Sequence, residues 1–204
     1  MDLSTEAFYS LLRSRWSVRR FSPDPVPDEA VSRILEASTW APSAHNRQPW
    51  RYAVLKDPEV RRRVAGVMGR EFHPALRQEG LSQSEAEGRV EKSKRRIVDA
   101  PVAILLFLDR SEIDHYDDVA RDRGEMTMAV QSTAIAGGYL LLAAAAEGLG
   151  GVWVCAPLFT PAALRETLEL PETWEPQAIL LLGHPVGSPP ARNRRGPDEI
   201  VRIF

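Results

Sequence analysis

The sequence contains very little cysteine. Cys155 is the one cysteine among 204 residues. A single thiol cannot form an internal disulfide, so a disulfide-stapled secreted domain is excluded and a reducing compartment is favoured. The first residues, Met1 to Glu6, lack the basic flank and the apolar run of a secretory signal. We therefore expect a cytoplasmic protein.

The chain also lacks a long hydrophobic run and an excess of positive charge. Its longest apolar stretch, residues 134–146, is shorter than the ~20 residues that cross a bilayer. The formal net charge is −2, whereas a nucleic-acid-binding surface needs bases that outweigh the acids. We expect neither a membrane nor a nucleic acid as partner. The basic runs 61–63 and 94–96 leave an anion-binding or nucleic-acid-binding protein as a remote alternative.

Signatures of three common sites are missing as well. No Gly-x-Gly-x-x-Gly follows an expected strand, because residues 148–151 (GLGG) precede one, and there is no P-loop. The four histidines are scattered without helical spacing, so we expect no metal site. A nucleophilic Cys155 with His184 is conceivable, but a lone cysteine in an apolar strand usually belongs to the core.

The patterning predicts one domain over residues 1–204. We expect helices at 5–13 and 29–39, another beginning at Pro58, and a charged helix at 81–98 that is either solvated or a mobile lid. The stretch 134–146 reads as a helix buried all round, in the core or a subunit interface. Strands are expected at 50–55, 102–108, 151–155 and 177–182, and residues 109–125 read as acidic and irregular. This order fits a wound α/β sheet and equally an α+β sandwich.

A polar turn between residues 41 and 50 (APSAHNRQPW) is the first candidate site. Pro42 and Pro49 restrict the backbone, while Ser43, Asn46 and Gln48 offer donors and acceptors within a few residues of each other. Such a mixture suits the edge of a planar heterocycle. The alternative is a side-chain-stabilised turn before an edge strand.

Two basic clusters complete the candidate site. Residues 13–21 (RSRWSVRRF) follow the first helix, and residues 192–195 (RNRR) lie near the C-terminus. Arginine presents a planar fork of donors that matches a phosphate, and serine adds a short donor. Taken with the polar turn, the two clusters predict a phosphorylated heterocycle as ligand. The alternative for each single run is a solvated charged face.

Together, these motifs resemble the nitroreductase family of FMN-dependent oxidoreductases. The segments that carry the resemblance are 15–21 (RWSVRRF), 41–50 (APSAHNRQPW), 148–153 (GLGGVW), 182–185 (LGHP) and 192–194 (RNR). They stand in the family's order and span nearly the whole chain. Within the family, residues 158–159, 170–171 and 174–176 most resemble the flavin domain of the bifunctional coenzyme F420 ligase.

The resemblance implies a fold and an assembly. The fold would be a single nitroreductase-like α+β sandwich, with a central, mostly antiparallel sheet flanked by helices. Two copies would intertwine as a homodimer that holds two FMN molecules at the interface, each site completed by both chains.

The resemblance also assigns residues to FMN. Arg15, Ser17, Arg192 and Arg194 would hold the phosphate and ribityl end, with Trp16 at a position where the family commonly has a basic residue. Arg19 would lie near the flavin N1 and O2 edge and raise the reduction potential. The partner subunit would contribute Pro42, Ser43, Ala44 and Asn46 of this sequence, with Gln48 nearby.

The flavin face opposite the substrate would lie against Cys155, Ala156 and Leu158. The family often offers a backbone amide to N5 there, and Pro157 has no amide hydrogen, so the donor depends on whether it falls at Leu158. The implied activity is ping-pong transfer from NADH or NADPH through FMN to a nitroaromatic, a quinone or a related small acceptor, with no catalytic side chain. The alternative is a flavin-binding or deazaflavin-binding reductase or partner in F420 metabolism.

Overall fold

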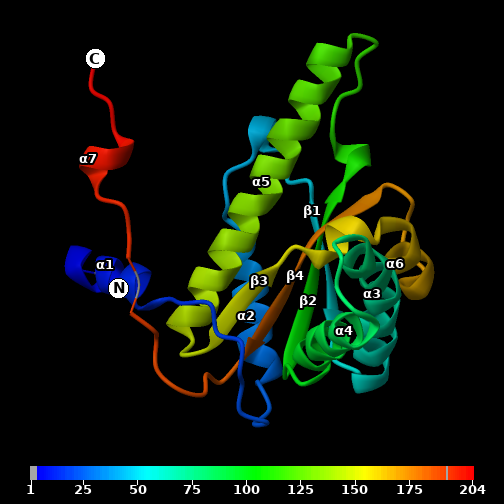
Figure 1. The fold of residues 1–204 in the computed structure, drawn as a ribbon. Helices are drawn as coiled ribbons and strands as arrows, with labels where there is room; N and C mark the ends of the chain where they lie inside the picture. The colour runs from blue at the N-terminus through cyan, green and yellow to red at the C-terminus, as the bar shows by residue number, and fades with distance from the viewer. Residues whose placement is uncertain (1–3, 192) are drawn as a thin grey trace.

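The computed structural model describes residues 4–191 and 193–204, and its centre is an antiparallel sheet between two helical layers (Figure 1). The strands β1 (Trp50–Leu55), β2 (Val102–Asp109), β3 (Gly150–Val154) and β4 (Trp174–Gly183) lie in the order β1-β2-β4-β3. Every neighbouring pair is antiparallel. The expected α+β class is confirmed, and the wound parallel sheet that the element order also allowed is wrong.

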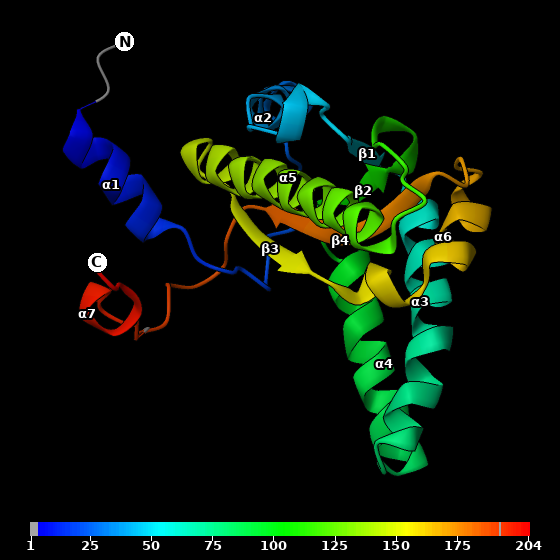
Figure 2. The same ribbon diagram turned by 90° about the horizontal axis from the view of Figure 1, so that it is seen from above.

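Helices cover both faces of the sheet (Figure 2). On one face lie α2 (Asp28–Thr39) and α5 (Val119–Ala146); on the other lie α3 (Pro58–Gln78), α4 (Gln83–Val98) and α6 (Pro161–Leu168). Strand β2 serves both cores, because Ile104 and Leu106 join the first and Leu105 and Phe107 join the second. All eight residues of β2 are therefore buried, which explains its unbroken apolar run.

The predicted elements agree closely with the observed ones over most of the described chain. Helix α1 (Thr5–Ser14), α2 and α4 begin and end within two residues of their predicted bounds, and β1 matches at both ends. Strand β4 begins at Trp174, three residues before the predicted start at residue 177, and continues to Gly183. The short helices α7 (Pro197–Ile200) and η2 (Arg110–Glu112) were not predicted.

Helix α5 begins well before the predicted residue 134. The Asp118 side chain accepts hydrogen bonds from the N–H groups of Ala120 and Arg121, and this N-cap starts the helix at Val119. Residues 110–118 are irregular apart from η2, as expected, but the irregular reading is wrong for Asp109, which ends β2, and for residues 119–125. The first turns of α5 are polar and largely exposed, so they carry no hydrophobic signal.

One chain alone does not bury the apolar helix on all sides, so the core alternative fails for part of its surface and the subunit interface stays a prediction. Ile135 and Tyr139, which are one turn apart on one side of α5, are 41% and 40% exposed, while its other side packs against α2 and the sheet. Helix α5 is the one described helix with the length and apolar composition to cross a bilayer. The chain itself therefore leaves an apolar strip of α5 uncovered.

Helices α3 and α4 form an antiparallel pair that extends beyond the sheet (Figure 2). Leu76, Ala86 and Val90 form a small core between them. Ser82 and Glu85 form a capping box at the start of α4. The predicted charged helix is thus present, with its apolar positions turned toward α3.

Both terminal segments lie apart from the core (Figure 1). Helix α1 has no buried residue and exposes Phe8 and Tyr9. After Gly183 the chain leaves the sheet, and its last residues expose Ile203 and Phe204. These apolar side chains find no cover within the described parts of a single copy.

Candidate functional site

A cavity of about 760 Å³ lies where the segment after α1 meets the segment after β4. Its lining consists of Arg15, Trp16, Ser17, Arg19, Arg20, Val186, Gly187, Ser188, Pro190 and Arg194. The two basic clusters singled out in the sequence, from opposite ends of the chain, therefore meet in one place. Arg192, which was predicted for the same group, lies outside the described residues.

The N-terminal wall of this cavity is fixed to the edge strand β3. Val18 is fully buried, and its N–H donates to the Gly151 oxygen at 3.0 Å. The glycine at position 150 makes room, because a Cβ there would lie 2.4 Å from Val18 Cγ2. In extended chain, neighbouring side chains point to opposite sides. With Val18 in the core, Ser17 and Arg19 line the cavity.

The C-terminal wall is joined to the same segment by backbone hydrogen bonds. The Val186 N–H donates to the Arg20 oxygen at 3.1 Å, and the Ser22 N–H donates to the His184 oxygen at 2.9 Å. Gly187 then turns the chain with a φ of 93°, a conformation that glycine adopts without strain. A Cβ on Gly187 would lie only 3.7 Å from Arg20 Nη2, so the Arg20 guanidinium rests beside this turn.

Three of the arginines that line the cavity have no carboxylate partner among the described residues. None of the ion pairs among the described residues involves Arg19, Arg20 or Arg194. Arg19 and Arg194 are exposed, and Arg19 Nη1 contacts only the Ser17 carbonyl oxygen, at 3.4 Å. Guanidinium groups with unused donors beside a serine hydroxyl suit a phosphate. The donor set therefore fits the phosphate end of FMN.

The predicted polar turn forms a strained loop between α2 and β1. Its centre is η1 (Ala44–Asn46), and His45, Asn46 and Gln48 have φ values of 52°, 54° and 50°. The left-handed region costs most non-glycine residues about 1–2 kcal/mol, whereas Asn and His adopt it more readily, and such strain gathers at functional sites. The loop does precede an edge strand, as the alternative reading held, but its backbone is not that of an ordinary turn.

Hydrogen bonds hold the strained loop in shape from inside and from α5. The Gln48 N–H donates to Ser43 Oγ at 3.0 Å, and Gln48 Nε2 donates to Asn46 Oδ1 at 3.3 Å. The Ala44 N–H donates to Ser132 Oγ at 3.2 Å. Ser132 is 4% exposed. The sequence reading missed it, because Ser132 appeared only as part of a polar flank of the apolar helix.

Arginines tie the same loop to the segment after β2. Arg47 forms an ion pair with Asp114, and Arg51 bonds Asp109 at 3.2 Å and also pairs with Glu112. Burial alone would raise the pKa of Asp109, but hydrogen bonds from Ser111 and the charge of Arg51 lower that pKa below its ordinary value. The loop is therefore braced on two sides.

The third predicted group lies on η3 (Ala156–Phe159), directly after β3. Cys155 is exposed, and the indole N–H of Trp153 donates to its Sγ at 3.1 Å. The expectation that Cys155 is a core residue is wrong, because β3 ends at Val154 and the chain turns outward. The Leu158 N–H donates to the Cys155 oxygen at 3.0 Å. In this conformation neither Leu158 nor Pro157 has an amide hydrogen directed at a ligand.

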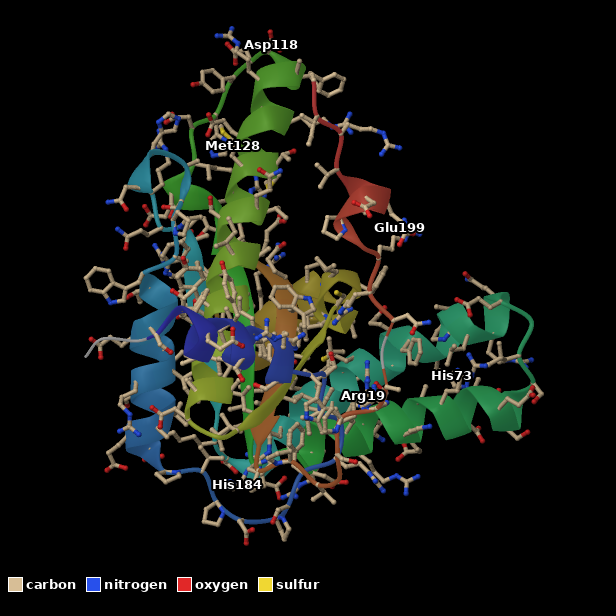
Figure 3. All side chains as sticks on the ribbon, turned by 90° about the vertical axis from the view of Figure 1, so that its left-hand side faces the viewer. Arg19, His73, Asp118, Met128, His184 and Glu199 are labelled. Atoms are coloured by element: carbon tan, nitrogen blue, oxygen red, sulfur yellow. The ribbon has the colours of Figure 1, made fainter. Side chains whose placement is uncertain are left out.

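One copy of the chain does not bring the three groups together. The basic cavity has no lining residue from positions 42–48 or 155–158. Met128 lines a small pocket with Ala44 and Arg47, and it lies toward the opposite end of the molecule from Arg19 (Figure 3). The strained loop is thus separated from the cavity of its own chain by much of the length of α5.

The other large cavity and the metal-ligating side chains of the described residues add no member to this group. A cavity of about 810 Å³ at the end of α6, lined among others by Arg110, Arg165 and Glu169, shares no residue with the predicted clusters. No group of three or more His, Cys, Asp or Glu side chains among the described residues is placed to hold a metal ion.

Comparison with known proteins extends these observations. The nitroreductase family model matches residues 12–184. A Thermus thermophilus NADH dehydrogenase is 32% identical, covering 84% of this chain and 83% of its own length. The 5,6-dimethylbenzimidazole synthase of Rhodospirillum rubrum is 31% identical, covering 86% of this chain and 81% of its own. The crystal structure of an iodotyrosine deiodinase bound to FMN and 3-iodo-L-tyrosine aligns with a TM-score of 0.74 and 28% identity, covering 96% of this chain and 98% of the other.

Proposed function

The chain belongs to the nitroreductase family of FMN-dependent oxidoreductases, and we propose that it takes its electrons from NADH or NADPH and passes them to a small organic acceptor. A nitroaromatic or a quinone is the class of acceptor we propose. When bound, FMN would supply the hydride and electron transfer, in a ping-pong sequence.

The observation that carries the proposal is the basic cavity between the two ends of the chain. Its arginines come from segments that the sequence places far apart, and Arg19 and Arg194 form no ion pair with any described residue. A protein gains nothing in stability from gathering unpaired like charges, since they repel one another. A bound dianion such as the FMN phosphate would offset that repulsion.

The cavity residues that the sequence singled out have binding roles in this proposal. Arg15, Ser17 and Arg194, together with Arg192, would hold the phosphate and the ribityl chain, and Trp16 would line the same wall. Arg19 would face the N1 and O2 edge of the ring. A cation there stabilises negative charge on the reduced ring, so Arg19 would raise the reduction potential as well as bind.

The strained loop would complete the cavity of a second copy. Pro42, Asn46 and Gln48 are exposed, and Ser43 and Ala44 are half-buried, although the loop is braced against its own chain. A homodimer built along the uncovered apolar strip of α5 would place this loop against the partner's flavin. The exposed side chains of α1 and the C-terminal segment favour the same assembly.

The remaining wall would come from Cys155, Ala156 and Leu158. Because Leu158 donates its amide within η3 and Pro157 has none, the side chains of this wall would exclude water without directing a Leu158 hydrogen bond to N5. No side chain is required as an acid or base. Substitutions should therefore act through FMN binding and reduction potential.

The first test is the absorbance spectrum of the purified protein and of any ligand released from it. Flavin bands that bleach on anaerobic addition of NADH or NADPH, and return with a quinone or nitroaromatic, are the expected result. A colourless protein that FMN does not reconstitute would overturn the cofactor assignment. Flavin bands that only reduced F420 bleaches would overturn the choice of reductant.

A further inference from the structure

A second, smaller cavity adjoins the basic cavity. Its arginines add positive charge beyond what the FMN phosphate requires. It has a volume of about 300 Å³ and is lined by Arg19, Arg20, Phe21, Arg96, Asp99 and Val186. Arg19, Arg20 and Val186 line both cavities. The two cavities therefore adjoin, and we call them together the groove, which extends from the C-terminal segment to the end of α4.

The groove holds more guanidinium groups than one phosphate requires. A phosphate monoester carries a charge of about −1.5 to −2 at neutral pH, which Arg15 and Arg194 suffice to balance. Arg20 and Arg96 remain, and neither takes part in an ion pair among the described residues. Asp99 lines the smaller cavity without pairing with either arginine, and its carboxylate lessens but does not cancel their charge.

Helix stability alone does not explain where Arg96 lies. Arg95 and Arg96 both stand in the last turn of α4, where a cation interacts favourably with the helix dipole. That benefit is similar for the two residues. Arg95 is exposed and lines no part of the groove, whereas Arg96 is half-buried and lines it. A comparison of Arg95 with Arg96 therefore separates the effect of lining the groove from the effect of a positive charge at the end of α4.

The backbone of Arg20 is fixed to the C-terminal segment, and its side chain is exposed. Its carbonyl oxygen accepts the Val186 N–H, and its guanidinium rests beside Gly187. Arg20 and Arg96 thus face one cavity from two separate parts of the fold.

We propose that Arg20 and Arg96 form a subsite for the 2′-phosphate of NADPH, next to the phosphate of FMN, and that the enzyme prefers NADPH to NADH. The inference rests on the proposed function, because it assigns the reductant of that same site. NADPH and NADH differ only by this phosphate. A second phosphate beside the first is repelled unless extra cations face it, and these arginines supply them.

The test compares Arg96→Ala with Arg95→Ala as the matched control, in the FMN-loaded protein. We expect Arg96→Ala to lower kcat/KM for NADPH about 10-fold to 100-fold, the range expected for one charge-assisted hydrogen bond. The change for NADH should stay within about twofold. Arg95→Ala should leave both values unchanged. Equal losses for NADPH and NADH, or no loss for NADPH, would overturn the subsite.

Ligand affinity tests the same subsite without turnover. Titration calorimetry with 2′,5′-ADP, and with 5′-AMP as the ligand that lacks the 2′-phosphate, should show tighter binding of 2′,5′-ADP. Arg20→Ala and Arg96→Ala should each remove most of that advantage. If the flavin bands are present and the two ligands bind equally, the subsite fails and the proposed function stands. If the flavin bands themselves are absent and FMN does not restore them, the proposed function fails.

Discussion

Arg194 offers the most direct test at the scale of single residues. It lines the basic cavity, whereas Arg195, the next residue, does not. Replacing Arg194 by alanine should weaken FMN binding by about 1.5–3 kcal/mol, the usual worth of a hydrogen bond to a charged group. That loss corresponds to roughly a tenfold to hundredfold higher Kd. Flavin content after gel filtration and a fluorescence titration with FMN would measure it.

Arg195→Ala is the control for this substitution, because it removes the same charge one residue away. It should retain FMN as the unchanged protein does. Equal flavin content in both variants would remove Arg194 from the phosphate site. Equal loss in both would indicate a long-range effect of net charge rather than a contact.

Residue types predicted which side chains line one cavity better than they predicted the residues that hold the neighbouring loop in place. Arginine and serine have few uses that combine so well as phosphate binding, so Arg15, Ser17 and Arg194 could be grouped before any coordinates. Ser132 could not be found this way, because its role depends on the Ala44 amide, which lies far from it in the sequence. Cys155 was misplaced because strand β3 ends one residue earlier than predicted.

At the scale of elements, the contact between α5 and the strained loop should be measurable. Ser132→Ala removes the acceptor for the Ala44 N–H and should lower the free energy of unfolding by about 1–3 kcal/mol. Thr133→Val is the control, because Thr133 Oγ1 is buried and has no hydrogen-bond partner among the described residues. Its replacement by an apolar group of the same shape should be neutral or stabilising. Urea unfolding of both variants would measure the difference. Similar stabilities would show that the Ser132–Ala44 hydrogen bond does not stabilise the loop.

The end of strand β2 should respond to acid. The pKa of Asp109 is lowered in the folded protein, because bonds from Ser111 and the charge of Arg51 outweigh the effect of burial. A carboxyl group with a lowered folded pKa stabilises the fold above its unfolded pKa of ~3.9, and that stability is lost as the pH falls through the folded pKa.

Urea midpoints measured between neutral pH and acid would test whether the contribution of Asp109 to stability falls as the pH falls. The difference in stability between the unchanged protein and Asp109→Asn should be largest near neutrality and should shrink in acid below about pH 4. A difference that stays constant over that range would show that the charge of Asp109 contributes nothing.

Helices and strands were predictable wherever their buried residues give the sequence a clear apolar pattern. Strand β1 matched at both ends, because its largely apolar run WRYAVL is bounded by Pro49 before it and by the charged residues Lys56 and Asp57 after it. Helix α5 was predicted too short, since its first turns face solvent and carry no apolar pattern. Its burial was overestimated for a different reason: an apolar residue looks the same in a sequence whether its own chain or a second copy covers it.

At the scale of the whole molecule, the separation of the strained loop from the basic cavity is the feature that most needs explanation. The loop carries the cost of three left-handed residues and is braced on two sides, yet it is not part of the cavity of its own chain. The apolar strip on α5, with Ile135 and Tyr139 about 40% exposed, lies between them. If two copies pair along this strip, each loop reaches the cavity of the other.

This arrangement predicts complementation between two defective chains. A variant with Arg194→Ala has a damaged cavity and an intact loop, and a variant with Asn46→Ala and Gln48→Ala has the reverse. Each should form homodimers that retain little FMN. In a mixed dimer, isolated through different affinity tags, one site combines both damaged parts and the other combines both intact parts.

The mixed dimer should therefore hold close to one FMN per pair of chains and recover about half the activity of the unchanged protein, since the intact site is built from undamaged parts of both copies. Flavin absorbance of the doubly purified dimer measures the occupancy. If each site belonged to a single chain, both sites in the mixed dimer would keep one damaged part, and the flavin content would remain as low as in the two homodimers. The cavity and the loop would then have to meet by a rearrangement within one chain, which the bracing of the loop by Ser132 and Arg47 opposes.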